Sequence, residues 1–459
     1  MNTPTGWTKP AIITAAFILA GSIAALAVNW PGHLSYDSIL QLHQGRAALY
    51  NNWHPPVMAW LLGLGDAIVP GSGLFVLFDI LVAFGALISI IALRPSRPSW
   101  ATVAVSIGII LSPQLLLYQG LVWKDVLFAD AAIGGFVCLA HAATHWNAIR
   151  ARASWLTASF LFLVLAALTR QNGVILLPCA AAALGWIAVR QGAGRLRSAL
   201  LGAGCLGASL IAVFGASAAL NLRSDGNPGP SEQLRLLQVY DLAGALARQP
   251  DLPLEQLTDD DPALEHLIRT QGARLYSPVR NDPIASAPDI QAALADSDPD
   301  AVAAQWRQTF TDHVWLYLRV RGAAFVWVFA TPDIAACRPV FTGVEGPARE
   351  MGELGLSPRR DARDRALETY GKALFGTPVF SHPAFAVLAA SCLILLLRRR
   401  GPADIAVAAM LLGAFAFTLS FFVISIACDY RYLYVLDLSA LAALLYLALD
   451  VRSALKGTP

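Results

Sequence analysis

The sequence predicts an all-α, polytopic membrane protein with about ten transmembrane helices. Of its 459 residues, 56% are hydrophobic and only 14% are charged, whereas soluble domains hold about 45–50% apolar and about 25% charged residues. Long apolar runs follow one another along most of the chain. These features exclude a disordered, collagen-like or disulfide-scaffold protein. The net charge of +2 comes with no dense basic face, so nucleic acid is not an expected partner.

Ten of the apolar runs approach or reach the roughly 17–25 residues that a helix needs to cross a bilayer. We expect spans at residues 11–29, 73–93, 101–118, 126–144, 154–169, 174–189, 199–220, 383–397, 404–427 and 433–450. The run 57–69 is shorter and contains Asp66. It is either an extra span or a helix that lies on the membrane surface.

The distribution of cations decides between these alternatives, because Lys and Arg concentrate in cytoplasmic loops. With 57–69 as an external juxtamembrane helix, 13 of the 17 cations outside segment 221–381 fall on the cytoplasmic side. These are Lys9, Arg94, Arg97, Arg150, Arg152, Arg190, Arg195, Arg197, Arg398, Arg399, Arg400, Arg452 and Lys456. The exceptions are Arg46, Lys124, Arg170 and Arg431. A full span at 57–69 would invert this pattern, so we expect both termini in the cytoplasm.

The chain divides into an N-terminal transmembrane module (1–220), a large external segment (221–381) and C-terminal transmembrane helices (382–459). The external segment holds 22 of the 31 carboxylates and contains amphipathic, helix-like pieces at 231–248 and 300–321. The run 359–365 has mixed charges typical of a solvated helix face. Six cysteines lie far apart, mostly in apolar runs, and indicate neither a zinc site nor a disulfide framework.

Ionisable side chains outside that segment gather on the external side. Seven of the nine remaining carboxylates do so: Asp37, Asp66, Asp79, Asp125, Asp130, Asp429 and Asp437. A charged residue at membrane depth costs about 2.5–3.5 kcal/mol and suggests a functional site by default. Gathering on one face favours a site that opens to the outside over an ion relay across the membrane.

The first external loop contains Tyr36, Asp37 and a turn at 53–56 that includes His54. Asp37 is the only carboxylate in this loop. It is a candidate general base for an acceptor hydroxyl, or a metal ligand, and equally a helix N-cap. His33, His43 and His54 have no metal-site spacing, so a divalent cation stays open as a cofactor with no ligand set indicated.

The other three external loops each carry a cation. Lys124-Asp125 is either a self-compensating pair that caps a helix or a phosphate-binding Lys beside an orienting carboxylate. Arg170 either extends to the interface or binds an anionic headgroup or an external carboxylate. Arg431 is a further candidate for binding an anion. The adjacent Tyr432 is also of a type commonly found at the membrane–water interface. No Walker loop, GxGxxG motif or GxSxG elbow is present, which disfavours nucleotide-driven chemistry and serine hydrolysis.

The order of these motifs resembles the polytopic, GT-C-fold glycosyltransferases that use polyprenyl-phosphate sugars, including family-39-like enzymes. The matching motifs are YDS at 36–38, WHPP at 53–56, WKD at 123–125, RQNG at 170–173 and DYRYLY at 429–434. The resemblance covers residues 10–220 and the last span, and the segment 221–381 matches no family. Where many members have an adjacent acidic pair, this chain has Asp37 followed by Ser38.

The resemblance implies a role for each of these residues. Asp37 is the expected base, Asp125 a supporting or metal-coordinating residue, and Lys124, Arg170 and Arg431 hold the donor phosphate. Residues expected to shape the loops and the acceptor site are Tyr36, His54, Asn172 and Tyr432.

The expected activity is sugar transfer, with inversion, from a polyprenyl-phosphate donor to a glycan, lipid or protein acceptor. The enzyme would sit in the cytoplasmic (inner) membrane with its active site facing the periplasm or exterior. A lipid-linked glycan transporter (flippase) or ligase is the alternative, although a transporter favours internal repeats and the sequence has none.

Overall fold

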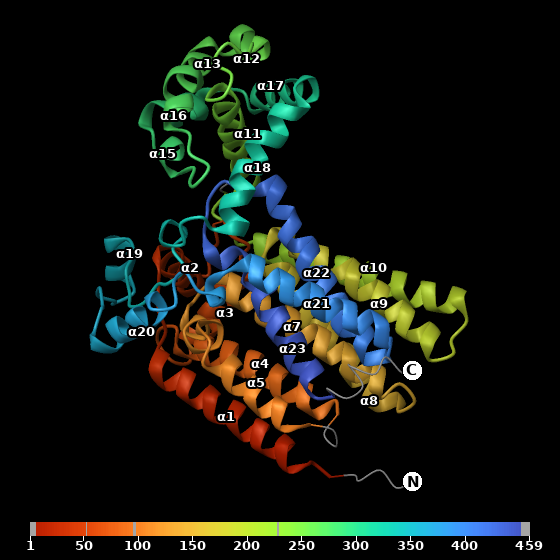
Figure 1. Ribbon diagram of the computed structural model, residues 1–459. Coiled ribbons are helices and arrows are strands. Elements are labelled where there is room, and N and C mark those ends of the chain that lie inside the picture. Colours follow the sequence, from red (N-terminus) through yellow and green to blue (C-terminus); the bar gives the residue numbers. More distant parts are fainter. Residues whose placement is uncertain (1–5, 52, 95–97, 227–228, 451–459) are drawn as a thin grey trace. The chain divides into compact units, whose positions relative to one another are not determined.

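The computed structural model describes residues 6–51, 53–94, 98–226 and 229–450. Within these ranges every regular element is a helix, and extended segments pair only in isolated bridges (Figure 1). The predicted all-α fold is therefore confirmed. Three of the cations assigned to the cytoplasm, Arg97, Arg452 and Lys456, lie outside the described residues.

The chain folds as two compact units. Unit 1 comprises Met1–Asp225, Val340–Phe417 and Arg431–Pro459, and unit 2 comprises Gly226–Pro339 and Thr418–Tyr430. Segment 340–381 thus packs with the apolar helices. The division at residues 220 and 381 concerns position relative to the bilayer and stays a prediction.

Unit 1 contains long apolar helices together with several short helices. They are α1 (Lys9–Asn29), α2 (Tyr36–Ala47), α3 (Val57–Asp66), α4 (Gly73–Ala92), α5 (Trp100–Ile110), α6 (Pro113–Leu116), η1 (Tyr118–Gly120), α7 (Lys124–Thr144), α8 (Ile149–Thr169), η2 (Gln171–Ile175), α9 (Leu176–Arg190), α10 (Arg195–Asn221), α19 (Ala348–Glu353), α20 (Ala362–Lys372), η5 (Pro378–Phe380), α21 (His382–Arg399), the first part of α22 (Pro402–Ile424), η6 (Tyr430–Leu433, from Arg431) and α23 (Tyr434–Ala448). α7 is buried along its length and packs against α4, α8 and α23.

Nine helices of the described chain are long and apolar enough to cross a membrane, which supports an integral membrane protein. The tenth predicted span, 101–118, is bent by 60° between α5 and α6. The bend falls at Ser112 and Pro113, because Pro113 lacks the N–H that a continuous helix needs. The run 57–69 forms the ten-residue helix α3, too short to span, as predicted.

α2 and α3 form a close hairpin. A Cβ on Gly45 would lie 2.2 Å from the Ala59 carbonyl oxygen, so only glycine allows this approach. Arg46 donates two hydrogen bonds to Asp66, of 2.7 and 2.6 Å, and links the ends of the two helices. This ion pair explains the presence of Arg46, one of the four cations outside the predicted cytoplasmic side.

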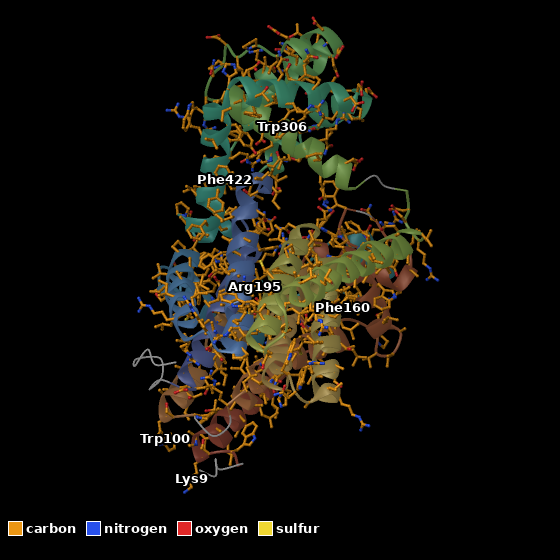
Figure 2. The ribbon with its side chains drawn as sticks, turned by 90° about the vertical axis from the view of Figure 1, so that its right-hand side faces the viewer. Lys9, Trp100, Phe160, Arg195, Trp306 and Phe422 are labelled. Carbon is orange, nitrogen blue, oxygen red and sulfur yellow. A yellow bond between two sulfur atoms is a disulfide. The ribbon has the colours of Figure 1, made fainter. Side chains whose placement is uncertain are left out.

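A group of charged side chains lies at the helix ends that are predicted to be cytoplasmic. Arg94, after α4, lies 3.5 Å from Asp404 and 3.2 Å from Asp450, and Tyr446 donates a 2.8 Å hydrogen bond to Asp404. Asp450 follows α23, whereas Arg431 precedes it. The two groups of charges therefore lie at opposite ends of α23, as the cation distribution requires. Figure 2 shows Lys9 and Trp100, the first residues of α1 and α5, at one end of this unit.

Unit 2 is a separate helical domain with its own apolar core. Its helices are α11 (Pro230–Leu246), α12 (Glu255–Asp260), α13 (Pro262–Leu267), η3 (Ile268–Gly272), α14 (Ala273–Leu275), α15 (Asp282–Ala285), α16 (Pro288–Asp296), α17 (Pro299–Asp312), α18 (Val314–Ala330) and η4 (Ala335–Cys337), with the last turns of α22. The piece predicted at 300–321 breaks at His313 into α17 and α18. The fully buried Arg321 pairs with Asp241 at 2.8 Å, and Trp306 donates to the same carboxylate. Trp306 is labelled in Figure 2.

Two sequence-based expectations are wrong. Cys337 and Cys428 form a disulfide within unit 2, although they lie 91 residues apart. The run 359–365 is not simply a solvated face, because Asp364 is fully buried and accepts a 3.2 Å hydrogen bond from Arg359. In both cases folding brings in a distant residue that leaves no local pattern: Cys428 for Cys337 and, at 3.5 Å, the buried His33 for Asp364.

Candidate active site

Asp37 occupies the second position of α2 and faces another part of the chain. The cap of α2 is Ser35, which forms a capping box with Ser38, so the alternative role of Asp37 as N-cap is wrong. Instead, the Asp37 carboxylate accepts a 2.9 Å hydrogen bond from Arg431, and Nε2 of His54 lies 3.8 Å from its other oxygen. The side chain remains 32% exposed. Asp37 is thus held between two groups yet open to an incoming molecule.

The surroundings of Asp37 favour its charged form. Burial raises the pKa of Asp37, but the contact with His54 and the charge of Arg431 outweigh burial and hold that pKa well below its usual range. The carboxylate is therefore ionised at neutral pH. It offers a negative charge and, when Arg431 is drawn away, a proton acceptor.

His54 is neutral and links Lys124 to Asp37. Burial and the charge of Lys124 lower the pKa of His54 to about 4, against the opposing effect of Asp37. Lys124 donates a 2.9 Å hydrogen bond to Nδ1 of His54. The imidazole proton then resides on Nε2, which faces Asp37. His54 and Lys124 belong to two different predicted motifs, at 53–56 and 123–125.

Asp125 holds two arginines. Its carboxylate, on a side chain only 2% exposed, pairs with Arg170 and lies 3.7 Å from Nε of Arg431. The local pair proposed between Lys124 and Asp125 is replaced by contacts to other loops, and the residue before α7, Trp123, caps no N–H with its side chain. Arg170 is thus partnered by an external carboxylate, one of its expected alternatives.

Aromatic rings fix the planes of the guanidinium groups. Arg431 stacks over Trp123 at 4.8 Å, and Tyr432 lies 5.9 Å from Arg431 and 5.4 Å from Arg170. Such cation–π contacts are worth about 0.5–2 kcal/mol each. Trp123 was missed as a site residue, although its position beside Lys124-Asp125 was a usable signal. Its indole N–H also donates a 2.9 Å hydrogen bond to Ser35.

Two further predicted residues, Tyr36 and Asn172, lie next to Asp37 and two positions after Arg170 in the chain. Tyr36 is 60% exposed and, among the described residues, makes no hydrogen bond or ring contact. Asn172 lies half-buried in η2, two residues after Arg170. Their expected role in shaping the acceptor site stays a prediction.

The histidines of the first loop go to different partners. His33 is buried, accepts a 3.0 Å hydrogen bond from the Gly343 N–H, and contacts Asn29 at 3.0 Å. Burial lowers the pKa of His33 to about 4. His43 contacts Glu353 at 2.6 Å. His33 therefore anchors segment 340–345 to the loop that carries Asp37, a role that no sequence motif announced.

The donor set of this cluster suits an anion. Asp37 and Asp125 each contact an arginine, and nowhere in residues 6–51, 53–94, 98–226 and 229–450 do three His, Cys, Asp or Glu side chains converge as metal ligands. A divalent cation therefore stays an untested prediction, and no chemical step below involves one.

The remaining external carboxylates lie outside the cluster. Asp437 binds the buried His382 at 2.8 Å, and Asp130 accepts a 2.9 Å hydrogen bond from Gln119 within the bundle. In unit 2, Asp429 lies 3.2 Å from Arg280. Only Asp37 and Asp125, of the seven, meet at the site.

Comparisons with known proteins identify similarity in structure only. No family model and no curated protein matches the sequence. The chain is similar to three crystal structures of the Archaeoglobus fulgidus oligosaccharyltransferase, one with Zn and sulfate (12% identity, TM-score 0.42, 94% of this chain and 48% of that chain), one tethered to an acceptor peptide (12%, 0.39, 95% and 49%), and one in the apo form (13%, 0.40, 95% and 50%). This chain thus spans about half the length of those chains. The functional conclusion below rests on the side chains of the site.

Proposed function

We propose that the protein is a membrane glycosyltransferase that moves a sugar from a polyprenyl-phosphate donor to an acceptor on the external side, with inversion. The observation that carries this proposal is the cluster in which Asp37 contacts Arg431 directly, while Lys124 joins it through His54 and Arg170 through Asp125. An ionised carboxylate beside three cations is the equipment for activating a hydroxyl next to a phosphate leaving group.

The charge balance of the cluster favours a phosphodiester. Arg170 and Arg431 balance the charges of Asp37 and Asp125, and His54 is neutral, so the protonated form of Lys124 gives the cluster a net charge of +1. A polyprenyl-phosphate sugar carries one negative charge at its phosphodiester and balances this surplus. When the bond to the sugar breaks, a second negative charge develops on the phosphate, where arginine forks bind most strongly.

The Asp37–Arg431 pair supports a donor-dependent base. A carboxylate with a strongly lowered pKa is a weak proton acceptor. A donor phosphate competes for Arg431, and its withdrawal from Asp37 raises the pKa of that carboxyl. Asp37 then removes the acceptor's hydroxyl proton as the oxygen attacks the anomeric carbon. The carbon–oxygen bond to the phosphate breaks, and the phosphate leaves with the electron pair.

The number of accessible carboxylates supports inversion over retention. A retaining enzyme needs a second carboxylate as nucleophile. Asp125 is 2% exposed and bound to Arg170, so it serves as a positioning residue for the arginines. A single displacement with Asp37 as base is the mechanism that this geometry favours.

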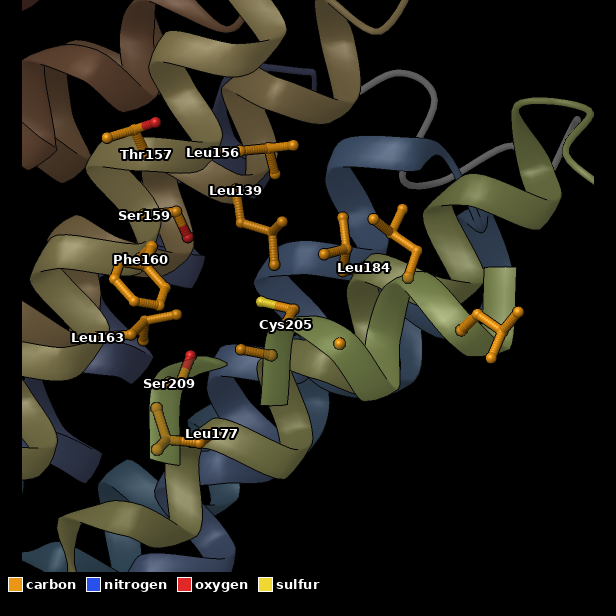
Figure 3. A pocket seen from close by; sticks show the side chains of 14 residues that line it. Leu139, Leu156, Thr157, Ser159, Phe160, Leu163, Leu177, Leu184, Cys205 and Ser209 are labelled. Atoms are coloured by element: carbon orange, nitrogen blue, oxygen red, sulfur yellow. The ribbon is translucent and has the colours of Figure 1, made fainter. Parts of the chain in front are cut away.

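An apolar pocket among the helices supports a site for the lipid. It has a volume of about 390 Å³ and is lined by side chains of α7, α8, α9 and α10, including Leu163, Leu177 and Cys205 (Figure 3). Arg170 caps the end of α8, and Leu177 follows in α9. A polyprenyl segment in this pocket would lie against the helices that lead to Arg170.

The test uses the full-length protein in proteoliposomes with radiolabelled undecaprenyl-phosphate sugar and a cell-envelope extract as acceptor. Asp37→Asn is expected to reduce transfer by at least ~10²-fold, the scale of general-base catalysis. Glu350→Gln, in helix α19 and outside the cluster, is the matched control. Transfer retained in Asp37→Asn would refute the base assignment. Movement of the intact donor between leaflets without cleavage would favour the flippase alternative.

A further inference from the structure

A polar pocket of about 480 Å³ lies between segment 340–345 and residues 358–368 of unit 1. Its volume falls in the range of about 300–1,000 Å³ for small-molecule sites. Side chains that line it include Phe341, Thr342, Glu345, Arg359, Arg360 and Glu368. None of these residues belongs to the cluster around Asp37, and the resemblance noted in the sequence assigns them no role.

The wall of this pocket is bonded to the loop that carries Asp37. The Leu34 N–H donates to the Gly343 carbonyl and the Glu345 N–H to the Leu34 carbonyl, both at 2.9 Å. A Cβ on Gly346 would lie 2.7 Å from Ile39 of α2, so the chain passes directly over this helix. The pocket therefore sits beside the helix turn that presents Asp37.

Ring contacts join the pocket to the cationic cluster. Phe341, in the pocket wall, lies 6.4 Å from Trp123, and Arg431 stacks on the same indole at 4.8 Å. A molecule in the pocket is thus two side chains away from the arginine that contacts Asp37. This places the pocket where a second substrate would meet an activated donor.

We propose that this pocket binds a neutral, hydroxyl-rich sugar unit of the acceptor, an inference that rests on the proposed glycosyl transfer. The charges of Glu345, Glu368 and the neighbouring Asp364 are balanced by those of Arg359, Arg360 and Lys372, so no net charge selects an ion. Carboxylates and guanidinium groups present several acceptors and donors to vicinal hydroxyls. Phe341 adds an apolar ring face.

The arrangement of the backbone disfavours an extended peptide. Recognition by strand addition needs an open row of backbone groups. Here Val344 exchanges hydrogen bonds with Arg359 at 2.9 and 3.0 Å on one side, and its flanking residues bond to Leu34 on the other. Both edges of the segment are occupied, so the ligand must be read by side chains.

Glu345 is the side chain best suited to direct contact with the ligand. Arg360 pairs with Glu368, and Arg359 is held by Asp364 at 3.2 Å and by the Gly32 carbonyl at 3.0 Å. Glu345 is exposed, and its carboxylate has no hydrogen bond or ion pair among the described residues. It can therefore accept hydroxyl protons without breaking an existing contact.

The test is saturation-transfer NMR on the full-length protein in lipid nanodiscs. The probes are the methyl glycosides of glucose, galactose, mannose and N-acetylglucosamine, with the peptide Ala-Ser-Ala and inorganic phosphate as competitors. We expect at least one glycoside to bind, and Glu345→Ala or Phe341→Ala to weaken it about ten-fold. Glu350→Ala, which lies outside the pocket, and the conservative Phe341→Tyr should leave binding unchanged.

The outcomes separate this inference from the proposed function. Binding of no glycoside, equal binding in both pocket variants, or displacement by the peptide or by phosphate would overturn the inference. Asp37→Asn should abolish transfer and retain glycoside binding. If the wild-type protein binds a glycoside in this pocket but never cleaves the donor, the pocket stands and the glycosyltransferase proposal fails.

Discussion

Asp37 and Arg431, 394 residues apart in the sequence, form a 2.9 Å ion pair at the candidate active site. The pair joins the first predicted external loop to the last. In the proposed reaction these two side chains act apart, Asp37 as the base and Arg431 as a ligand of the donor phosphate. Donor binding and base activation would then be coupled, because the phosphate that recruits Arg431 also frees Asp37.

The first prediction concerns this coupling. Arg431→Ala removes the cation that lowers the pKa of Asp37, so that pKa rises, and it weakens donor binding about ten-fold or more through the loss of a charge-assisted contact. Binding of radiolabelled donor to nanodiscs measures the affinity. Arg349→Ala, which changes an exposed arginine of α19, is the matched control. Unchanged donor affinity in Arg431→Ala and Arg170→Ala together would remove both arginines from the phosphate site.

The second prediction concerns pH. The imidazole of His54 should titrate near pH 4 in ¹⁵N-histidine NMR, below the ordinary value of about 6.5. Between about pH 6.5 and pH 4 the His54 imidazole is protonated in the unfolded chain but not in the folded protein. The free energy of unfolding should therefore fall as the pH drops through this range. Lys124→Met should raise the pKa of His54, and Asp37→Asn should lower it further. A midpoint near 6.5 in the wild-type protein would contradict the Lys124–His54 hydrogen bond.

The third prediction concerns Asp125. Asp125→Asn leaves Arg170 buried without its counter-charge and should cost about 3–5 kcal/mol of stability. Thermal unfolding in nanodiscs measures the loss. The double variant Asp125→Leu/Arg170→Met removes both charges and should recover most of the stability while donor binding stays weak. Recovery of donor binding in the double variant would show that the pair is purely structural.

The fourth prediction concerns the α2–α3 hairpin. Gly45→Ala forces a methyl group against the Ala59 carbonyl oxygen and should cost about 1–3 kcal/mol. Because α2 carries Asp37, transfer activity should fall as well. Gly85→Ala is the control, since a Cβ there meets nothing within 4 Å. Equal unfolding temperatures for the two variants would show that the hairpin tolerates a wider spacing.

The external loops illustrate how far sequence patterns reach. The motifs around Asp37, Lys124 and Arg170 were recognised because charge at the end of an apolar run is rare and costly. An external carboxylate is among the partners that the sequence suggests for Arg170, but the sequence does not identify Asp125 as that carboxylate or Arg431 as the partner of Asp37, since an ion pair leaves no trace in the local sequence. The role of Asp37 as an N-cap looked plausible locally, yet Ser35 provides the cap and frees Asp37 for Arg431.

What the sequence by itself determined is the set of apolar spans and the separation of charges to their two ends. Hydropathy and cation asymmetry are local properties, read within about twenty residues, and the bend at Pro113 is the one interruption of a predicted span within the described chain. Only the tertiary structure decided which charges meet: Asp37 with Arg431, Asp125 with Arg170, and Lys124 with His54. These choices depend on helix packing, which brings the ends of distant spans to one place and selects each counter-charge by distance.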